Sequence, residues 1–206
     1  AHFDGLSPEE SQLEENKNRR YIVSVIIATF ITGILGIVNS KLIGDLNVKF
    51  VCAGFLVTAC LLILSAIVEK RMQKSQEKNA SANNLPPSWK QAIVIGFAQG
   101  CGTLPGISRS GSTIAGALFC GTNRSVAGEF SFIIAIPAIL GAFLLELKDV
   151  SQMADVGLLP ILLGCLTAFV SGYIALYLLM KIIRKGHLEC FACYLIPVGV
   201  LGLIFL

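Results

Sequence analysis

The residues best suited to chemistry lie in one run, LPGISRSGST, at positions 104–113. It places an arginine, four hydroxyls and two glycines in the middle of an apolar chain. A charged side chain at the centre of a membrane-spanning helix costs at least ~2.5 kcal/mol. Arg109 therefore needs a compensating partner, and an anion is the simplest candidate.

The residue types around Arg109 predict a phosphate-binding turn. Glycines allow tight turns and let a ligand approach backbone N–H groups closely. Ser108 occupies the position expected for the N-cap of a following helix, and a helix N-terminus attracts anions by itself. Arg109 adds a permanent charge and a planar fork that fits phosphate oxygens. The predicted phosphate-binding residues are Gly106, Ser108, Arg109, Ser110 and Gly111.

Other interpretations of this turn stay open. The same residues fit a serine-rich helix cap whose arginine extends to the membrane interface. Gln99 comes just before a Gly/Pro-rich break and can form a hydrogen bond across it. Glu129 lies early in the next apolar segment, where it can pair with Arg124 or Arg109 or stay at the interface. Gln99 and Glu129 are therefore candidate supporting residues.

The composition of the chain indicates which class of protein carries the residues of this run. The chain has 206 residues, of which 54% are hydrophobic and 14% are charged, and its mean hydropathy is +0.75. Soluble domains carry about 25% charged residues. Apolar runs of roughly 20 residues recur, as in a protein that crosses the bilayer several times. The net charge of +3 is small and sits between the runs, so we expect no nucleic-acid partner.

The apolar runs predict an all-α polytopic membrane protein with about five spanning helices and one re-entrant helical hairpin. The hairpin is expected over 89–120, because its two apolar pieces are each too short to cross ~30 Å at 1.5 Å per residue. Pro137 is expected to kink its helix. The predicted order is a polar segment over 1–20, spanning helices over 21–38 and 48–68, a flexible charged loop over 69–88, hairpin pieces over 89–99 and 108–120, and spanning helices over 124–146, 158–182 and 188–206.

Basic residues predict the orientation of these elements. Most of them fall in the N-terminal flank, in the 69–90 segment and in the 181–185 segment. A re-entrant hairpin places all three segments on one side of the membrane, and the positive-inside rule makes that side cytoplasmic. The chain then divides into a cytoplasmic segment over 1–20, two spanning helices over 21–68, a cytoplasmic loop over 69–88 and a phosphate-binding repeat over 89–206.

The central run resembles a motif of the undecaprenyl-diphosphate phosphatase family, the bacterial bacitracin-resistance proteins. That family carries PGxSRSxxT, and residues Pro105 to Thr113 match it without a mismatch. The resemblance continues in the EFSF run that starts at Glu129, in Pro137 and in Gln99. Essentially all 206 residues can be placed on the family pattern.

The resemblance implies a membrane-embedded enzyme that removes the terminal phosphate of a C55 isoprenyl diphosphate. Such an enzyme recycles the lipid carrier of peptidoglycan synthesis in the bacterial inner (plasma) membrane, and so contributes to cell-wall biogenesis, cell shape and bacitracin resistance. The family fold consists of two inverted repeats, each with a re-entrant hairpin. Ser108, Arg109 and Thr113 match the family's catalytic positions.

A second family motif has no counterpart here. The family carries Glu-xxx-Glu and then Leu-Pro-x-Ser-Ser-x-Gly-His near its N-terminus, so this chain is expected to begin about a quarter of the way into the pattern. The upstream part would supply the histidine and the ligands of a divalent cation, Mg²⁺ or Ca²⁺; the identity of the metal stays open. The expected partners are an isoprenyl diphosphate lipid, the bilayer, and either the upstream segment or a second copy of the chain. The chain alone is expected to be inactive.

Two other functions remain possible from the sequence. A transporter or flippase of an anionic isoprenyl lipid would also use broken helices whose N-termini point at an anion. The second possibility is a non-catalytic membrane fragment that folds only with a partner. Release of inorganic phosphate separates the phosphatase from both.

Overall fold

The computed structural model describes residues 7–42, 47–76, 85–147, 157–186 and 188–205, and helices joined by short turns make up most of this part of the chain. This confirms the all-α prediction for the described part of the chain. The helices are α1 (Pro8–Leu42), α2 (Val48–Gln76), α3 (Trp89–Cys101), α4 (Arg109–Phe119), α5 (Arg124–Glu146), α6 (Leu158–Lys185), the 3-10 turn η3 (Leu188–Phe191) and α7 (Ala192–Phe205).

Five of these segments are long and apolar enough to cross a membrane, as predicted. They are α1, α2, α5, α6, and η3 together with α7. In contrast, α3 has 13 residues and α4 has 11, which gives lengths of about 20 and 17 Å at 1.5 Å per residue. Neither can cross ~30 Å of hydrocarbon, so this pair forms the predicted re-entrant hairpin.

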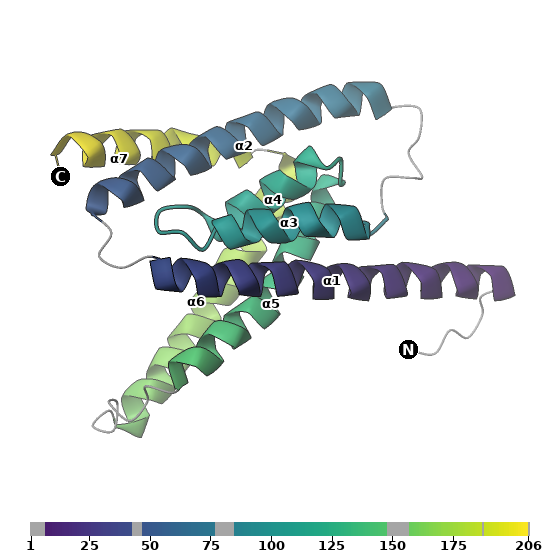
Figure 1. Cartoon of the computed structure of the whole chain (residues 1–206), viewed down its shortest axis with the longest axis horizontal. Coiled ribbons are helices and arrows are strands. Elements are labelled where there is room, and N and C mark those ends of the chain that lie inside the picture. The colour runs from purple at the N-terminus through teal and green to yellow at the C-terminus, as the bar shows by residue number, and fades with distance from the viewer. Residues whose placement is uncertain (1–6, 43–46, 77–84, 148–156, 187, 206) are drawn as a thin grey trace.

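The hairpin is held between the two longest helices of the bundle. In Figure 1, α3 and α4 lie between α1 and α2, and α7 lies along α2. Helices α1 and α3 pack closely together, and a side chain at Gly96 would lie 2.7 Å from the Ala28 carbonyl oxygen. The hydroxyl of Thr32 lies 2.8 Å from that oxygen and 3.1 Å from the Gly96 oxygen. Small residues thus let the two backbones meet.

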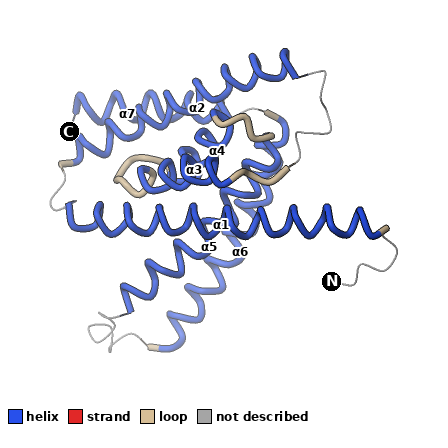
Figure 2. Tube along the Cα trace, turned by 45° about the vertical axis from the view of Figure 1, so that its right-hand side comes forward, coloured by secondary structure: helices blue, strands red, loops and turns tan. Residues whose placement is uncertain are grey.

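Helices α5 and α6 form an arm that diverges from this body. Figures 1 and 2 show them running together away from α1, α2 and α7. The start of α5 is anchored to α1 through Phe130, whose ring meets the Tyr21 ring edge to face at 5.6 Å. Helix α6 is almost entirely exposed and apolar along its length, as expected of a surface that faces lipid.

The predicted basic segments lie together at one end of the molecule. The hydroxyl of Ser24, midway along α1 and just after its basic residues, donates to the Pro87 oxygen before α3, at 2.6 Å. The amide of Gln91 in α3 donates to the Cys120 oxygen at the end of α4, at 2.9 Å. Arg184 at the end of α6 pairs with α5. The described parts of the three segments therefore share one end, here called the basic end. Its cytoplasmic location stays a prediction.

Several predicted boundaries were wrong by a few turns. Helix α5 spans 124–146 as expected, but α1 begins at Pro8 and so includes most of the predicted polar segment. The reason is a capping box, in which Ser7 and Glu10 exchange side-chain and backbone hydrogen bonds around a proline at the first helical position.

Two further boundaries differ from the prediction. Helix α2 continues to Gln76, into the predicted 69–88 loop, where charged residues do not interrupt a helix that is already nucleated. Helix α3 includes Gly100, which was assigned to the break. Residues 77–84 of the predicted loop lie outside the described residues. The kink at Pro137, which lies within α5, stays a prediction.

Candidate phosphate-binding site

The motif residues form the tight turn at the tip of the hairpin. Consecutive turns join α3 to α4, with Leu104 N–H donating to Cys101 O and Ile107 N–H donating to Leu104 O, each at 3.1 Å. Gly106 has φ = +83°, and a side chain there would overlap the Val51 carbonyl oxygen of α2. Only glycine adopts this backbone without strain, which explains the Pro-Gly pair in the motif.

Ser108 caps the helix that carries the motif, as predicted. Its Oγ accepts a hydrogen bond from Gly111 N–H at 3.1 Å. Two other motif hydroxyls point back into α4, where Ser112 donates to Ser108 O at 2.9 Å and Thr113 donates to Arg109 O at 2.6 Å. Thr113 is buried. It therefore stabilises the first turn of α4 and does not present its hydroxyl at the surface.

Arg109 stands at the first position of α4 and is only partly buried. Its guanidinium forms no hydrogen bond or ion pair with any described residue. The backbone N–H groups of Arg109 and Ser110 likewise donate to no acceptor in the described part of the chain. A permanent positive charge and free N–H donors at a helix N-terminus form a site for an anion, and a planar fork favours phosphate.

Two polar residues of the spanning helices hold the tip in place. The hydroxyl of Thr58 on α2 accepts from Ser108 N–H at 3.0 Å and lies 3.0 Å from Gly54 O. The amide of Asn39 on α1 donates to Gly100 O at 3.0 Å and to the Thr103 hydroxyl at 2.7 Å. The prediction missed both residues. Both are polar side chains inside apolar runs, and such a side chain needs a partner at membrane depth. This pattern is the sequence signal that could have identified them.

The position of the tip follows from these contacts. Asn39 lies within one turn of the end of α1, and Val51 lies within one turn of the start of α2. The connected ends of α1 and α2 are opposite the basic end. The hairpin thus starts at the basic end and carries its phosphate-binding turn close to the other end of the bundle.

The sequence that forms this turn and the helices around it matches a known protein family. A family model described as "Bacitracin resistance protein BacA" matches residues 3–201. The chain belongs to this family.

Curated relatives support the same assignment. A protein named undecaprenyl-diphosphatase from Treponema denticola is 40% identical over 195 residues, which cover 94% of this chain and 68% of the relative. Proteins of the same name from Methanobrevibacter smithii and Bacteroides fragilis are 40% and 34% identical, and the chain covers 64% and 71% of their lengths. The chain therefore spans about two thirds of the length of these family members.

Gln99 and Glu129, the predicted supporting residues, are not at the tip of the family motif. Gln99 is buried, and its amide donates to Ile134 O of α5 at 3.2 Å, so it ties the hairpin to α5 and does not bridge the break. Glu129 lies at the basic end of α5, where it pairs with Arg184 at 3.5 Å. The sequence leaves three possibilities open for Glu129; the structure shows neither Arg124 nor Arg109 as its partner, and the side chain is 53% exposed.

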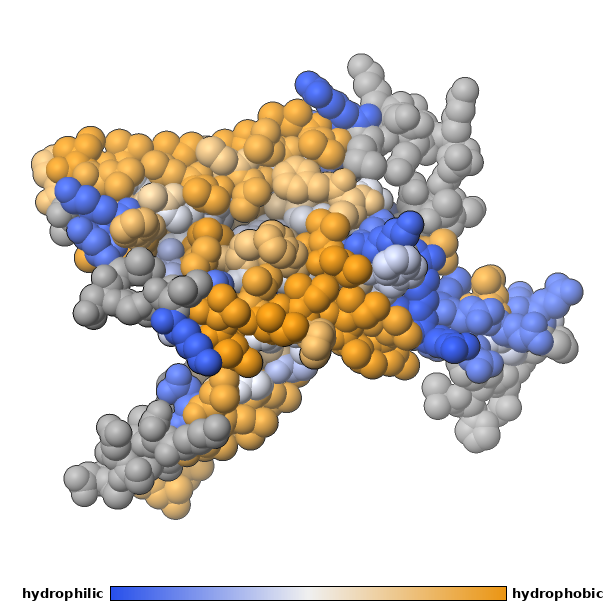
Figure 3. All heavy atoms as spheres, viewed as in Figure 1, coloured by the Kyte–Doolittle hydropathy of each residue, from blue (hydrophilic) through white to orange (hydrophobic). Residues whose placement is uncertain are grey.

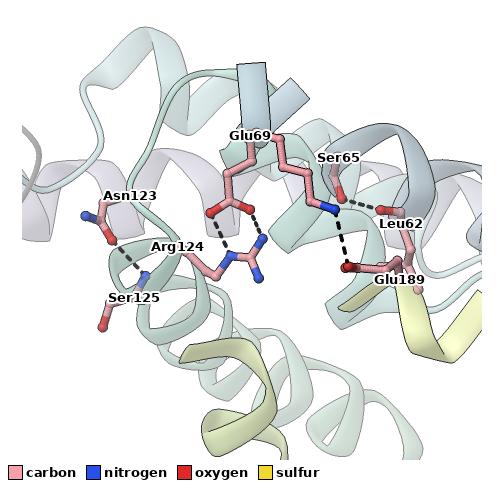
Figure 4. A network of polar contacts seen from close by, with 8 residues as sticks. Leu62, Ser65, Glu69, Asn123, Arg124, Ser125 and Glu189 are labelled. Carbon is pink, nitrogen blue, oxygen red and sulfur yellow. Dashed lines mark hydrogen bonds and ion pairs between the residues drawn. The ribbon is translucent and has the colours of Figure 1, made fainter. Parts of the chain in front are cut away.

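Arg124 instead forms the main ion pair of the basic end. Figure 4 shows its Nε and Nη2 atoms donating to the two carboxylate oxygens of Glu69. Only 12% and 9% of the Arg124 and Glu69 side chains are exposed. The adjacent Lys70 reaches Glu189 of η3 at 3.8 Å. This network connects the end of α2 to the start of α5 and to the segment before α7. It lies away from the phosphate-binding turn.

The ligands of the expected divalent cation were predicted to lie upstream, and the described residues do not form such a set. Among them, no three His, Cys, Asp or Glu side chains come together as metal ligands, whereas Mg²⁺ and Ca²⁺ require a set of oxygen ligands. No described carboxylate or imidazole bonds to Ser108, Arg109 or Ser110 either. Cys120 is at the far end of α4, and burial raises the pKa of its thiol, which makes it a poor nucleophile. The turn can bind phosphate, but it offers no base.

Proposed function

We propose that this chain is the phosphate-binding part of an integral membrane undecaprenyl-diphosphatase, which converts undecaprenyl diphosphate to undecaprenyl phosphate. The observation that carries the proposal is the unpaired Arg109 guanidinium beside free N–H groups at the start of α4. The names of the curated relatives supply the substrate and the reaction. Recycling of the lipid carrier for cell-wall synthesis in the bacterial plasma membrane is the corresponding cellular role.

The chemistry assigns a limited task to each motif residue. In the hydrolysis, water attacks the terminal phosphorus, the bond from phosphorus to the bridging oxygen breaks, and inorganic phosphate and the lipid monophosphate leave. Arg109 binds two non-bridging oxygens and stabilises the charge that develops on them. The hydroxyl of Ser110, the free N–H groups and the exposed edge of Ser108 add donors. Thr113 positions Arg109 through its bond to the Arg109 carbonyl.

The base that activates water and the carboxylates that hold any Mg²⁺ or Ca²⁺ come, in this proposal, from residues other than the described ones. The part of the relatives that this chain does not cover is their natural source. The tip lies opposite the basic end, which supports a reaction near the outer surface of the membrane under the positive-inside rule.

The test replaces Arg109 by lysine, which keeps the charge but removes the fork. The assay is phosphate release from undecaprenyl diphosphate by this chain joined to the uncovered part of the Treponema denticola relative. Loss of a preorganised donor to a developing oxyanion costs about 100-fold in turnover, and we expect a loss of this size for R109K. The matched control is R71K at the basic end, which should retain activity.

Two outcomes would overturn the proposal. Near-normal turnover of R109K would leave Arg109 a point-charge role at most. Transfer of the intact diphosphate across liposomes, without any phosphate release by the unmodified protein, would favour a flippase.

A further inference from the structure

A second basic site lies at the basic end, far from the hairpin tip, where α1 passes the start of α3. It is an open pocket of about 420 Å³. One face of α1 forms one side, and the first residues of α3 form the other. The residues that line it include Asn16, Arg19, Arg20, Val23, Ser88 and Trp89.

Within the described part of the chain, the two arginines of the pocket have no acidic partner. Arg20 donates through Nε to the Pro87 carbonyl at 3.4 Å, which orients its side chain toward α3. Arg19 forms no hydrogen bond or ion pair with any described residue. The nearby Glu14 is paired with Lys17 at 2.7 Å instead. Two adjacent guanidinium groups on one pocket wall repel each other unless an anion lies between them.

The walls of the pocket are fixed by internal hydrogen bonds. The buried Ser24 hydroxyl donates to Pro87 O at 2.6 Å and holds the start of α3 against α1. Ser88 and Gln91 form a capping box at the first turn of α3. These serines have their own partners, so the donors left for a ligand are the guanidinium groups and the Asn16 amide. A site that is rigid before binding loses little entropy when it is occupied.

The pocket stands at the level of a membrane surface. Arg19 and Arg20 come directly before the apolar part of α1, which begins at Tyr21. Trp89 is 55% exposed beside them, and Lys90 lies 5.4 Å from its ring. Figure 3 shows hydrophilic atoms over the first turns of α1 next to the apolar surface of the bundle. Tryptophan and arginine are enriched at this boundary.

We propose that this pocket binds the phosphate group of an anionic phospholipid in the leaflet at the basic end. Arg19 and Arg20 bind the phosphate oxygens, and Trp89 and Val23 contact the glycerol and the first acyl carbons. The site is separate from the Arg109 site, which binds the substrate phosphate at the opposite end. Occupation would hold α3, and therefore the whole hairpin, against α1.

Trp89 is the only tryptophan of the chain, so its fluorescence reports on this pocket alone. The full chain is placed in two kinds of nanodisc, both with equal parts phosphatidylglycerol and phosphatidylcholine. Bromine, which quenches tryptophan fluorescence, is attached to the acyl chains of phosphatidylglycerol in one kind and of phosphatidylcholine in the other. The two membranes therefore differ only in which lipid quenches Trp89. Each basic residue near the surface contributes roughly fivefold to binding of an anionic lipid, so for the two arginines we expect about a 25-fold preference for phosphatidylglycerol.

Variants distinguish binding of the lipid at this pocket from general electrostatic attraction between the basic end and anionic lipids. R19Q/R20Q should reduce the preference to nearly one. R19Q alone should reduce it about fivefold, and this variant serves if the double variant does not fold, because Arg19 contacts no described partner. The matched control is K181Q/K185Q, which removes the same charge from the same end on α6 and should keep the preference.

The proposal is overturned if the unmodified chain shows no preference, or if the α6 control loses as much as R19Q/R20Q. An excess of inorganic phosphate should leave the quenching by brominated phosphatidylglycerol unchanged. Displacement of the lipid by inorganic phosphate would identify a free-phosphate site and contradict a lipid head-group site.

Discussion

The hydroxyl of Thr58 accepts a hydrogen bond from the backbone N–H of Ser108 at 3.0 Å, which joins a spanning helix to the cap of the motif helix. Nearby, Gly54 lets α2 approach the tip so closely that a side chain there would lie 2.7 Å from the Gly106 carbonyl carbon. The phosphate-binding turn is therefore built against α2. The orientation of Arg109 depends on residues about 50 positions earlier in the chain.

We predict that T58V lowers activity although valine has nearly the shape of threonine. The substitution leaves the Ser108 N–H without its acceptor; a fully buried unpaired group costs about 1–3 kcal/mol, and this bond is partly buried. We expect kcat to fall by about tenfold and KM to change less, because the turn is misplaced and not removed. Phosphate release by the chimaeric protein measures both. T58S keeps the hydroxyl and should restore activity; a T58S variant as poor as T58V would show that only packing matters.

Gly106 offers a test of the backbone of the turn. G106A forces a side chain into the left-handed region, at a cost of roughly 1–2 kcal/mol, and also drives it against Val51 of α2. We expect a lower midpoint of thermal unfolding in detergent and weaker phosphate binding. The matched control is G141A on α5, where no described atom beyond the local helix backbone lies within 4 Å of the added carbon. This control should be neutral or slightly stabilising, and equal effects of the two changes would rule out a special role for Gly106.

The sequence predicts the large elements well, because burial in a membrane imposes simple rules. Hydropathy and length are sufficient to find α5, and the short apolar pieces on either side of the Pro-Gly pair are sufficient for the hairpin. The cap at Ser108 follows from local chemistry and is also confirmed. Each of these features depends on residues close together in the sequence.

The errors concern contacts between distant segments. Glu129 has arginines at several distances along the chain, and only the fold shows that Arg184 is beside it while Arg124 turns to Glu69. Gln99 is one turn from the break but points at Ile134 of α5. Single polar residues such as these offer several equal partners, so the pattern alone cannot choose among them.

The ion pair of Glu69 and Arg124 should be the most costly one to break. E69Q removes the carboxylate bonded to a largely buried guanidinium and leaves only the weaker attraction of Glu189; breaking a buried pair destabilises a protein by on the order of 3 kcal/mol. We expect E69Q/R124Q to be more stable than E69Q, since the poorly compensated charge is removed. Unfolding in denaturant, followed by circular dichroism in detergent micelles, measures the difference.

The pair of Glu129 and Arg184 provides the comparison for this experiment. Its side chains are 53% and 63% exposed, and exposed pairs contribute about 0–1 kcal/mol. E129Q should therefore change the free energy of unfolding much less than E69Q. Similar losses for both variants would mean that the Glu69 pair is not protected from solvent as its burial indicates.

The chemical groups at the hairpin tip predict that these 206 residues alone bind phosphate without hydrolysing the substrate. The tip holds an arginine, hydroxyls and free N–H groups, which bind a phosphate, but no described carboxylate or imidazole bonds to them. We expect the purified chain in liposomes to bind phosphate and to release none from undecaprenyl diphosphate, with or without added Mg²⁺ or Ca²⁺. Joining it to the uncovered part of the Treponema denticola relative should restore turnover, and R109K in that chimaera should lower it about 100-fold. Robust hydrolysis by the 206 residues alone would show that the base lies within this chain.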